Sequence, residues 1–198
     1  MTQNWSMLAL ICLIVAGCHG PALRDEMRTS AVVGGGEAFA GPDAATAFEL
    51  RHGGRLEASL AEARMAAVAK RLCSANPDLG SDWAFHVLAS DQPNAFSLPS
   101  GRIYLTQALC QRRIGEDHDL LAAVIAHEMA HVALGHGRQR PCRHEAEALD
   151  REMAADRAAV SYLARAGYPS TCLADLLRLT KDLQPDHWAA ARLQALGH

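Results

Sequence analysis

The sequence predicts a mainly helical α+β domain with a small antiparallel sheet bordering a cleft. Two observations support this fold class. From residue 117 onward, almost the whole chain carries apolar residues at helical spacing. Before that point, residues 83–89 and 95–106 have the composition of short strands, and Pro99-Ser100-Gly101 marks a turn. The 198 residues suffice for one sizeable core.

Local signals set the expected ends of each helix. The first covers residues 56–73 and stops at Asn76-Pro77. Asp117 is a cap-type residue before a strongly apolar run, and Gly135 ends that second helix. Three further helices are expected at residues 143–166, 171–183 and 187–196.

The candidate chemistry lies in the apolar helix, at His127-Glu128-Met129-Ala130-His131. Residues four apart on a helix lie about 40° from each other around its axis, so both imidazoles can reach one zinc ion at roughly 2.0–2.1 Å. Glu128 is placed to contact a zinc-bound water and exchange its proton. Burying these polar side chains in such a helix without a partner would be costly. The pattern therefore predicts one Zn²⁺ per chain, with Glu128 as the catalytic residue.

A catalytic zinc needs a third protein ligand and an open position. The pattern with a histidine six residues beyond the second one fails, because Gly137 stands there. A glutamate from the following helix fits better: Glu152 is followed four residues later by Asp156, which would orient a ligand histidine. Glu145 and Glu147 are rivals that lack such an aspartate, and we expect both on a solvated helix face.

The other histidines lack ligand spacing. His136 lies nine residues after His127, about 180° around a helix, so we expect it in a cap or at the surface. We expect His86, His118 and His144 to be structural or exposed.

Three blocks of sequence occur together: NAFSLPSGRIY at 94–104, HEMAHVALGH at 127–136 and EMAAD at 152–156. In this order they resemble the gluzincin peptidases of the HtpX, BepA, LoiP and CAAX-prenyl-protease type, peptidase family forty-eight. The resemblance implies a gluzincin-type zinc metalloendopeptidase domain, with its third metal ligand in the EMAAD block.

The resemblance also implies where a substrate binds. Asn94, Ala95 and Phe96 would form an edge strand beside the cleft, to which an extended peptide adds as a further strand. The family often ends with an HP-x4-R segment. Here His187 is followed by Trp188 and lies one residue too close to Arg192. Arg192 is therefore a candidate cleft residue, whereas the spacing gives His187 no clear role.

The N-terminus has the features of an export signal. Residues 1–17 contain a short apolar run that ends Val15-Ala16-Gly17 before Cys18, which resembles a bacterial lipobox with lipidation at Cys18. Residues 18–54 are rich in Gly and Ala and are expected to form a flexible tether to the domain at 55–198. The predicted location is the periplasmic face of the envelope, as an outer-membrane lipoprotein.

Cysteine usage fits an oxidising compartment. Besides Cys12 and Cys18, four cysteines fall in the predicted domain, and an even number predicts two disulfide bonds of undetermined connectivity. These four are Cys73, Cys110, Cys142 and Cys172.

The expected function is hydrolysis of peptide bonds in envelope protein quality control. The expected partners are unfolded or misfolded polypeptides and, through the lipid anchor, a membrane. A net charge of −3 without a basic patch gives no support for nucleic-acid binding. The alternative is a non-hydrolytic lipoprotein, stabilised by zinc, that binds misfolded or assembling outer-membrane proteins.

Overall fold

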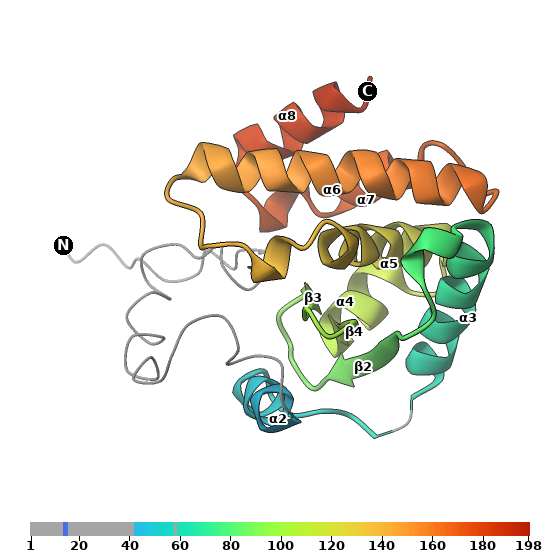
Figure 1. Cartoon of the computed structure of the whole chain (residues 1–198), viewed down its shortest axis with the longest axis vertical. Helices are drawn as coiled ribbons and strands as arrows, with labels where there is room; N and C mark the ends of the chain where they lie inside the picture. Colours follow the sequence, from blue (N-terminus) through green and yellow to red (C-terminus); the bar gives the residue numbers. More distant parts are fainter. Residues whose placement is uncertain (1–13, 16–41, 58) are drawn as a thin grey trace.

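The computed structural model describes residues 14–15, 42–57 and 59–198 (Figure 1). It is mostly helical with one small sheet, so the predicted α+β class is confirmed. The helices are α2 (Pro42–Arg51), α3 (Leu60–Ala75), α4 (Gln107–Leu109), α5 (His118–Ala133), α6 (Glu145–Arg165), α7 (Cys172–Leu179) and α8 (Asp186–Ala195). The strands are β1 (Ile14–Val15), β2 (Ala84–Leu88), β3 (Ala95–Ser97) and β4 (Arg102–Thr106). Short single turns, η1 (Pro77–Leu79), η2 (Cys110–Ile114), η3 (His136–Arg138) and η4 (Lys181–Leu183), link these elements.

The sheet has the strand order β1-β3-β4-β2. β3 and β4 are antiparallel across a tight turn at which Gly101 adopts a φ of 83°. β2 runs parallel to β4, so the sheet is mixed and the expectation of an antiparallel sheet is wrong for this pair. The reason is that β4 lies between β2 and β3, and local composition does not encode strand order. On the outer side of β3, the two residues of β1 pair in parallel with Phe96 and Ser97.

The central element is α5, which lies between the sheet and α6 and also packs against α3 and α7 (Figure 1). Its residues from Leu121 to His131 are all buried, as expected for an apolar helix in the middle of a core. Asp117 accepts from the backbone N–H groups of Asp119 and Leu120, so the predicted N-cap is confirmed. A helix buried on every side needs partners for any polar side chain that it carries.

The end of the predicted tether is folded. In α2, the ring of Phe48 lies edge-on to Phe96 at 5.2 Å and close to Tyr104. The Tyr104 hydroxyl donates to a carboxylate oxygen of Glu49 at 2.9 Å. Among the described residues, α2 therefore packs onto the domain, because its apolar partners lie some fifty residues further along the chain.

The predicted export features lie almost entirely outside the described residues. Only Ile14 and Val15 of the signal segment are described, and Cys18 is not. Within the described ranges, no helix is both long and apolar enough to cross a membrane.

The cysteines correct one prediction. Cys73, Cys110 and Cys172 are free thiols, so two disulfide bonds among the four cysteines of the domain do not form. All three lie in or against the main apolar core, where cysteine packs as a small hydrophobic residue. Burial raises the pKa of Cys110 and of Cys172 to about 11, which disfavours the reactive thiolate. Because these three thiols are free, Cys142 forms no disulfide bond with any of them.

Candidate metal centre

Two buried histidines on α5 converge. His127 and His131 are each 1% exposed, and their Nε2 atoms lie 2.9 Å apart. The spacing of four residues places both rings on one side of the helix, as the sequence predicts. In a neutral imidazole one ring nitrogen carries a lone pair, so two such nitrogens can bind a single cation between them.

The third group comes from α6, which packs along α5. Glu152 places Oε2 at 3.3 Å from Nε2 of His127 and Oε1 at 3.4 Å from Nε2 of His131. These three side chains offer ligand atoms that all lie within 4.8 Å of one another. The rivals lie elsewhere: Glu145 is exposed beside His187 and Trp188, and Glu147 binds arginines near the start of α6.

The donor set fits a zinc ion. Glu152 Oε2 is a buried oxygen without a hydrogen-bond partner among the described residues, and its charged neighbours, Nε2 of His127 and Nη1 of Arg192, lie at 3.3 Å and 3.4 Å. Burial lowers the pKa of His127, but Asp156 and Glu152 outweigh this effect and raise it to about 9. The space between these groups therefore favours positive charge. Two imidazoles and one carboxylate, with a further position open, are the ligands of catalytic zinc sites.

Glu128 lies next to the histidines and is 1% exposed. Its Oε1 has no hydrogen-bond partner within the described part of the chain, while the Ser97 side chain bonds to the carboxylate. Burial raises the pKa of Glu128 to about 7, although His127 and Ser97 act in the opposite direction. Such a carboxylate can both accept and return a proton near neutral pH.

His127 is held from behind by charged groups. Its Nδ1 lies 2.9 Å from Oδ1 of Asp156, and Arg192 of α8 donates to both Asp156 oxygens at 2.7 Å. Arg192 is 3% exposed and also lies 3.4 Å from Glu152. Burial raises the pKa of Asp156, but Arg192 and His127 bring it below its usual range. The structure thus places Arg192 behind the cluster, whereas His187 forms an exposed pair with Glu145.

His131 is held by a residue that the sequence reasoning placed wrongly. His136 is 4% exposed, and its Nδ1 lies 2.9 Å from Nδ1 of His131. The expectation that His136 lies in a cap or at the surface is wrong, because it assumed that α5 continues to residue 136. Instead, α5 ends at Ala133, and Gly135 turns the chain in the left-handed region with a φ of 66°. The glycine after the helix was the signal that helical angles no longer apply at residue 136.

The predicted edge strand lies beside the cluster, with its residues in different roles. Asn94 precedes β3 and is tied to Thr106, and the Phe96 side chain packs in the aromatic cluster under α2. Ala95 belongs to the core shared with α5. Alternation along a strand places Ser97 on the same face as Ala95, which explains its contact with Glu128. Ser97 was not singled out from the sequence, although this alternation could have identified it.

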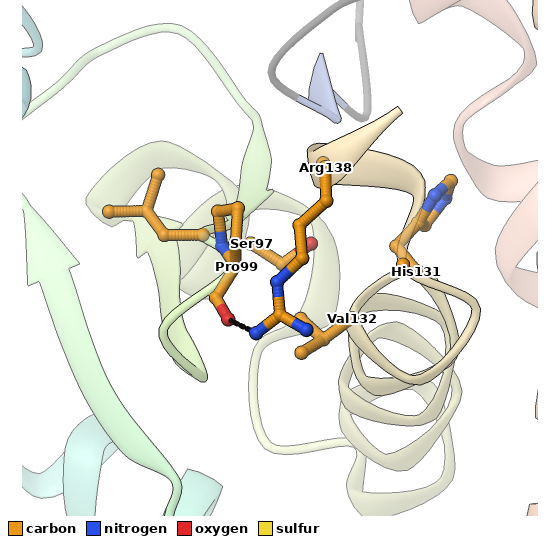
Figure 2. Close-up of a pocket in the computed structure, with 8 residues that line it drawn as sticks. Ser97, Pro99, His131, Val132 and Arg138 are labelled. Atoms are coloured by element: carbon orange, nitrogen blue, oxygen red, sulfur yellow. Dashed lines mark hydrogen bonds between the residues drawn. The ribbon is translucent and has the colours of Figure 1, made fainter. Parts of the chain in front are cut away.

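A small hollow opens next to His131, between the β3–β4 turn and the segment after α5 (Figure 2). Ser97 and Pro99 line one side, and His131 and Val132 line the other. Its volume of about 10 Å³ admits about one water molecule. Arg138 spans the hollow and donates to the carbonyl oxygen of Pro99 at 3.0 Å, so this contact ties η3 to the turn (Figure 2).

Comparison with known proteins supports this picture. Residues 59–149 match the model of peptidase family M48. The resemblance indicated by the sequence blocks is thereby confirmed for the family, though not for a particular branch of it. The matched segment contains His127, Glu128 and His131 but stops before Glu152, so the choice of third ligand depends on the packing of α6 against α5.

Similarity to a metalloendopeptidase agrees with the family match. The mitochondrial metalloendopeptidase OMA1 of Schizosaccharomyces pombe is 36% identical to this chain over 73 residues. The alignment covers 37% of this chain and 21% of the yeast protein. The likeness therefore concerns one segment and does not extend to the whole of either protein.

Proposed function

We propose that this chain is a zinc-dependent metalloendopeptidase that hydrolyses peptide bonds in unfolded or misfolded polypeptides. The observation that carries the proposal is the convergence of His127, His131 and Glu152 with the unsatisfied carboxylate oxygen of Glu128 beside them. A structural metal site would not need that fourth group, and it usually has four protein ligands. The M48 match and the similarity to a metalloendopeptidase support the same activity.

The residues divide the chemistry between them. His127, His131 and Glu152 would hold one zinc ion, which as a Lewis acid lowers the pKa of water toward about 7. Glu128 accepts a proton at its free Oε1 and returns it to the leaving amine, as its pKa of about 7 allows. Ser97 bonds to the same carboxylate and limits its rotation. Oδ1 of Asp156 lies 2.9 Å from Nδ1 of His127, and this contact directs Nε2 of the ring toward the cluster.

Substrate binding would use the outer edge of β3. That edge carries backbone groups that can pair with another strand, as its pairing with Ile14 and Val15 illustrates. An extended peptide added there would run past Ser97, which contacts Glu128. Recognition through the backbone is tolerant of side chains, which suits a peptidase acting on unfolded chains.

The test is hydrolysis of unfolded casein by the purified, zinc-loaded chain. Glu128→Gln should retain zinc and the fold but lose about 10²–10⁴-fold in rate, because glutamine cannot take the proton. Glu145→Gln is the matched control, since this glutamate is exposed and outside the cluster. A chelator should abolish hydrolysis. Cleavage by Glu128→Gln at the wild-type rate would rule out this mechanism, and a zinc-loaded wild type that never cleaves would favour the non-hydrolytic alternative.

We also propose that the chain is exported and anchored by lipid at Cys18, and that it acts in envelope protein quality control. The support is the apolar run and the small residues that precede Cys18. Several acyl chains on one cysteine anchor stably, whereas one chain binds only marginally. Mass spectrometry of the N-terminal peptide from a bacterial expression host decides this point. An unmodified Cys18, or a mature chain that begins elsewhere, would exclude the anchor without affecting the peptidase proposal.

A further inference from the structure

His136 forms a second pair of histidines with His131, and the proposed mechanism gives His136 no role. Its ring is 4% exposed, and its centroid lies 5.0 Å from that of His131 with an angle of 69° between the ring planes. The short contact joins Nδ1 of one ring to Nδ1 of the other at 2.9 Å. Two ring nitrogens at this distance form a hydrogen bond only if one carries a proton and the other does not.

The direction of this hydrogen bond follows from the other side of His131. Its Nε2 faces Glu152 and His127, so this nitrogen must offer its lone pair in order to bind a cation. A neutral His131 then carries its proton on Nδ1 and donates it. The acceptor that the contact provides is Nδ1 of His136, whose own proton is therefore on Nε2.

The segment that carries His136 is fixed in place. Gly135 turns the chain with a φ of 66°, and the backbone N–H of Arg138 donates to the Gly135 carbonyl at 3.0 Å. Gly137 packs so closely on the β3–β4 turn that a Cβ there would lie 2.9 Å from Cγ of Pro99. The Arg138 contact with the Pro99 carbonyl fixes the same junction from the other side (Figure 2).

We propose that His136 is a positioning residue that holds His131 in the tautomer and orientation required to bind the metal through Nε2. The proposal rests on the metal site of the proposed function. It assigns to a neutral imidazole the role that the Asp156 carboxylate has toward His127. An outer partner of this kind typically contributes 10–100-fold in metal affinity.

Two substitutions of equal size separate this role from simple packing. In His136→Asn, the side-chain oxygen can occupy the place of Nδ1 and accept the same hydrogen bond, whereas His136→Leu has nearly the same shape and no acceptor. Zinc affinity is measured by competition with a chromophoric chelator, and the visible spectrum of the cobalt-substituted proteins reports the ligand geometry. His118→Leu, at an exposed position at the start of α5, is the control.

We expect zinc affinity to fall about 10–100-fold in His136→Leu, with an altered cobalt spectrum. His136→Asn should stay within about threefold of the wild type, and His118→Leu should match it. Wild-type affinity in His136→Leu, or equal losses in the leucine and asparagine variants, would overturn the proposal.

A second measurement needs no variant, in case His136→Leu does not fold. Long-range ¹H–¹⁵N spectra of the zinc-loaded wild type should show His131 protonated at Nδ1 and metal-bound at Nε2, and the opposite assignment would overturn the proposal. These readouts do not depend on turnover. A wild type that binds zinc without cleaving casein refutes only the peptidase function, whereas a wild type that binds no zinc refutes both.

Discussion

His127 and His131 lie one turn apart on α5, yet the Nδ1 atoms of their rings, which face away from the cluster, contact different kinds of group. Nδ1 of His127 contacts a carboxylate, Asp156, which is itself bound by Arg192. Nδ1 of His131 contacts the imidazole of His136. Asp156 lies in α6, about 30 residues after His127, and Arg192 lies in α8, about 65 residues after it. His136 comes from the turn directly after α5.

Charge balance gives a physical reason for this difference. With a divalent cation bound, the charges of the ion and Arg192 equal in number those of the carboxylates of Glu128, Glu152 and Asp156. A second carboxylate behind His131 would add a buried negative charge beyond this balance, and burying a further charge is unfavourable. A neutral imidazole orients its partner without adding charge. One side of the site is thus held by an ion pair and the other by a neutral hydrogen bond.

The largest expected effect comes from removing the group that both sides share. Glu152 contacts both histidines, so Glu152→Ala should reduce zinc affinity more than the roughly 100-fold upper limit for outer partners and abolish hydrolysis. Metal analysis after dialysis measures the loss. Glu145→Ala and Glu147→Ala should keep zinc, because their carboxylates lie outside the cluster. Full retention in Glu152→Ala, with loss in either control, would give the ligand role to a different glutamate.

The charged side is tested next by Asp156→Asn. The amide keeps an oxygen for His127 but brings an NH₂ group toward Arg192, so we expect a 10–100-fold loss in zinc affinity or activity. Competition with a chelator and casein hydrolysis measure the two quantities. A loss larger than that of His136→Leu would show that the charged partner contributes more than the neutral one. An unchanged affinity would mean that the Asp156 contact does not orient His127.

The smallest effect on zinc affinity is expected for Arg192→Met, whose main effect is on stability. Removing Arg192 leaves Asp156 buried without its counterion, so the free energy of unfolding should fall by about 3–5 kcal/mol. Urea unfolding of the metal-free proteins measures it. The loss in His136→Leu should be smaller, about 1–3 kcal/mol, because only a neutral donor is left unpaired. Similar losses in the two variants would contradict the contrast between a charged and a neutral side.

The same ion pair gives this difference a pH dependence. Because Arg192 and His127 lower the folded-state pKa of Asp156, its contribution to stability is present above the ordinary aspartate pKa of about 4. It is lost as the pH falls below that value toward the folded-state pKa. Arg192→Met should therefore differ from the wild type less at low pH than at neutral pH. A constant difference across this range would argue against the ion pair as its source.

The sequence specified those parts of the site that depend on regular geometry. Four-residue spacing on a helix brings His127 and His131 together, and the same spacing from Glu152 to Asp156 gives one helix both a contact to the cluster and a contact behind it. Caps and breakers at Asp117, Asn76 and Gly135 fixed the helix ends. Each of these features acts between residues close in the chain, so it can be recognised without knowing the fold.

Only the tertiary structure decided the rest. The packing of α6 on α5 brings Glu152, the glutamate that the sequence favoured, to the two histidines, and the sheet places β4 between β2 and β3. The tertiary structure also brought His136 inward, because a single glycine changes the direction of the chain and makes helical angles meaningless beyond it. Contacts between distant residues depend on how several helices and strands pack together, and no local sequence pattern carries that information. His136, behind His131, is therefore the part of this site that the sequence left open, whereas Asp156 behind His127 was predicted from its spacing.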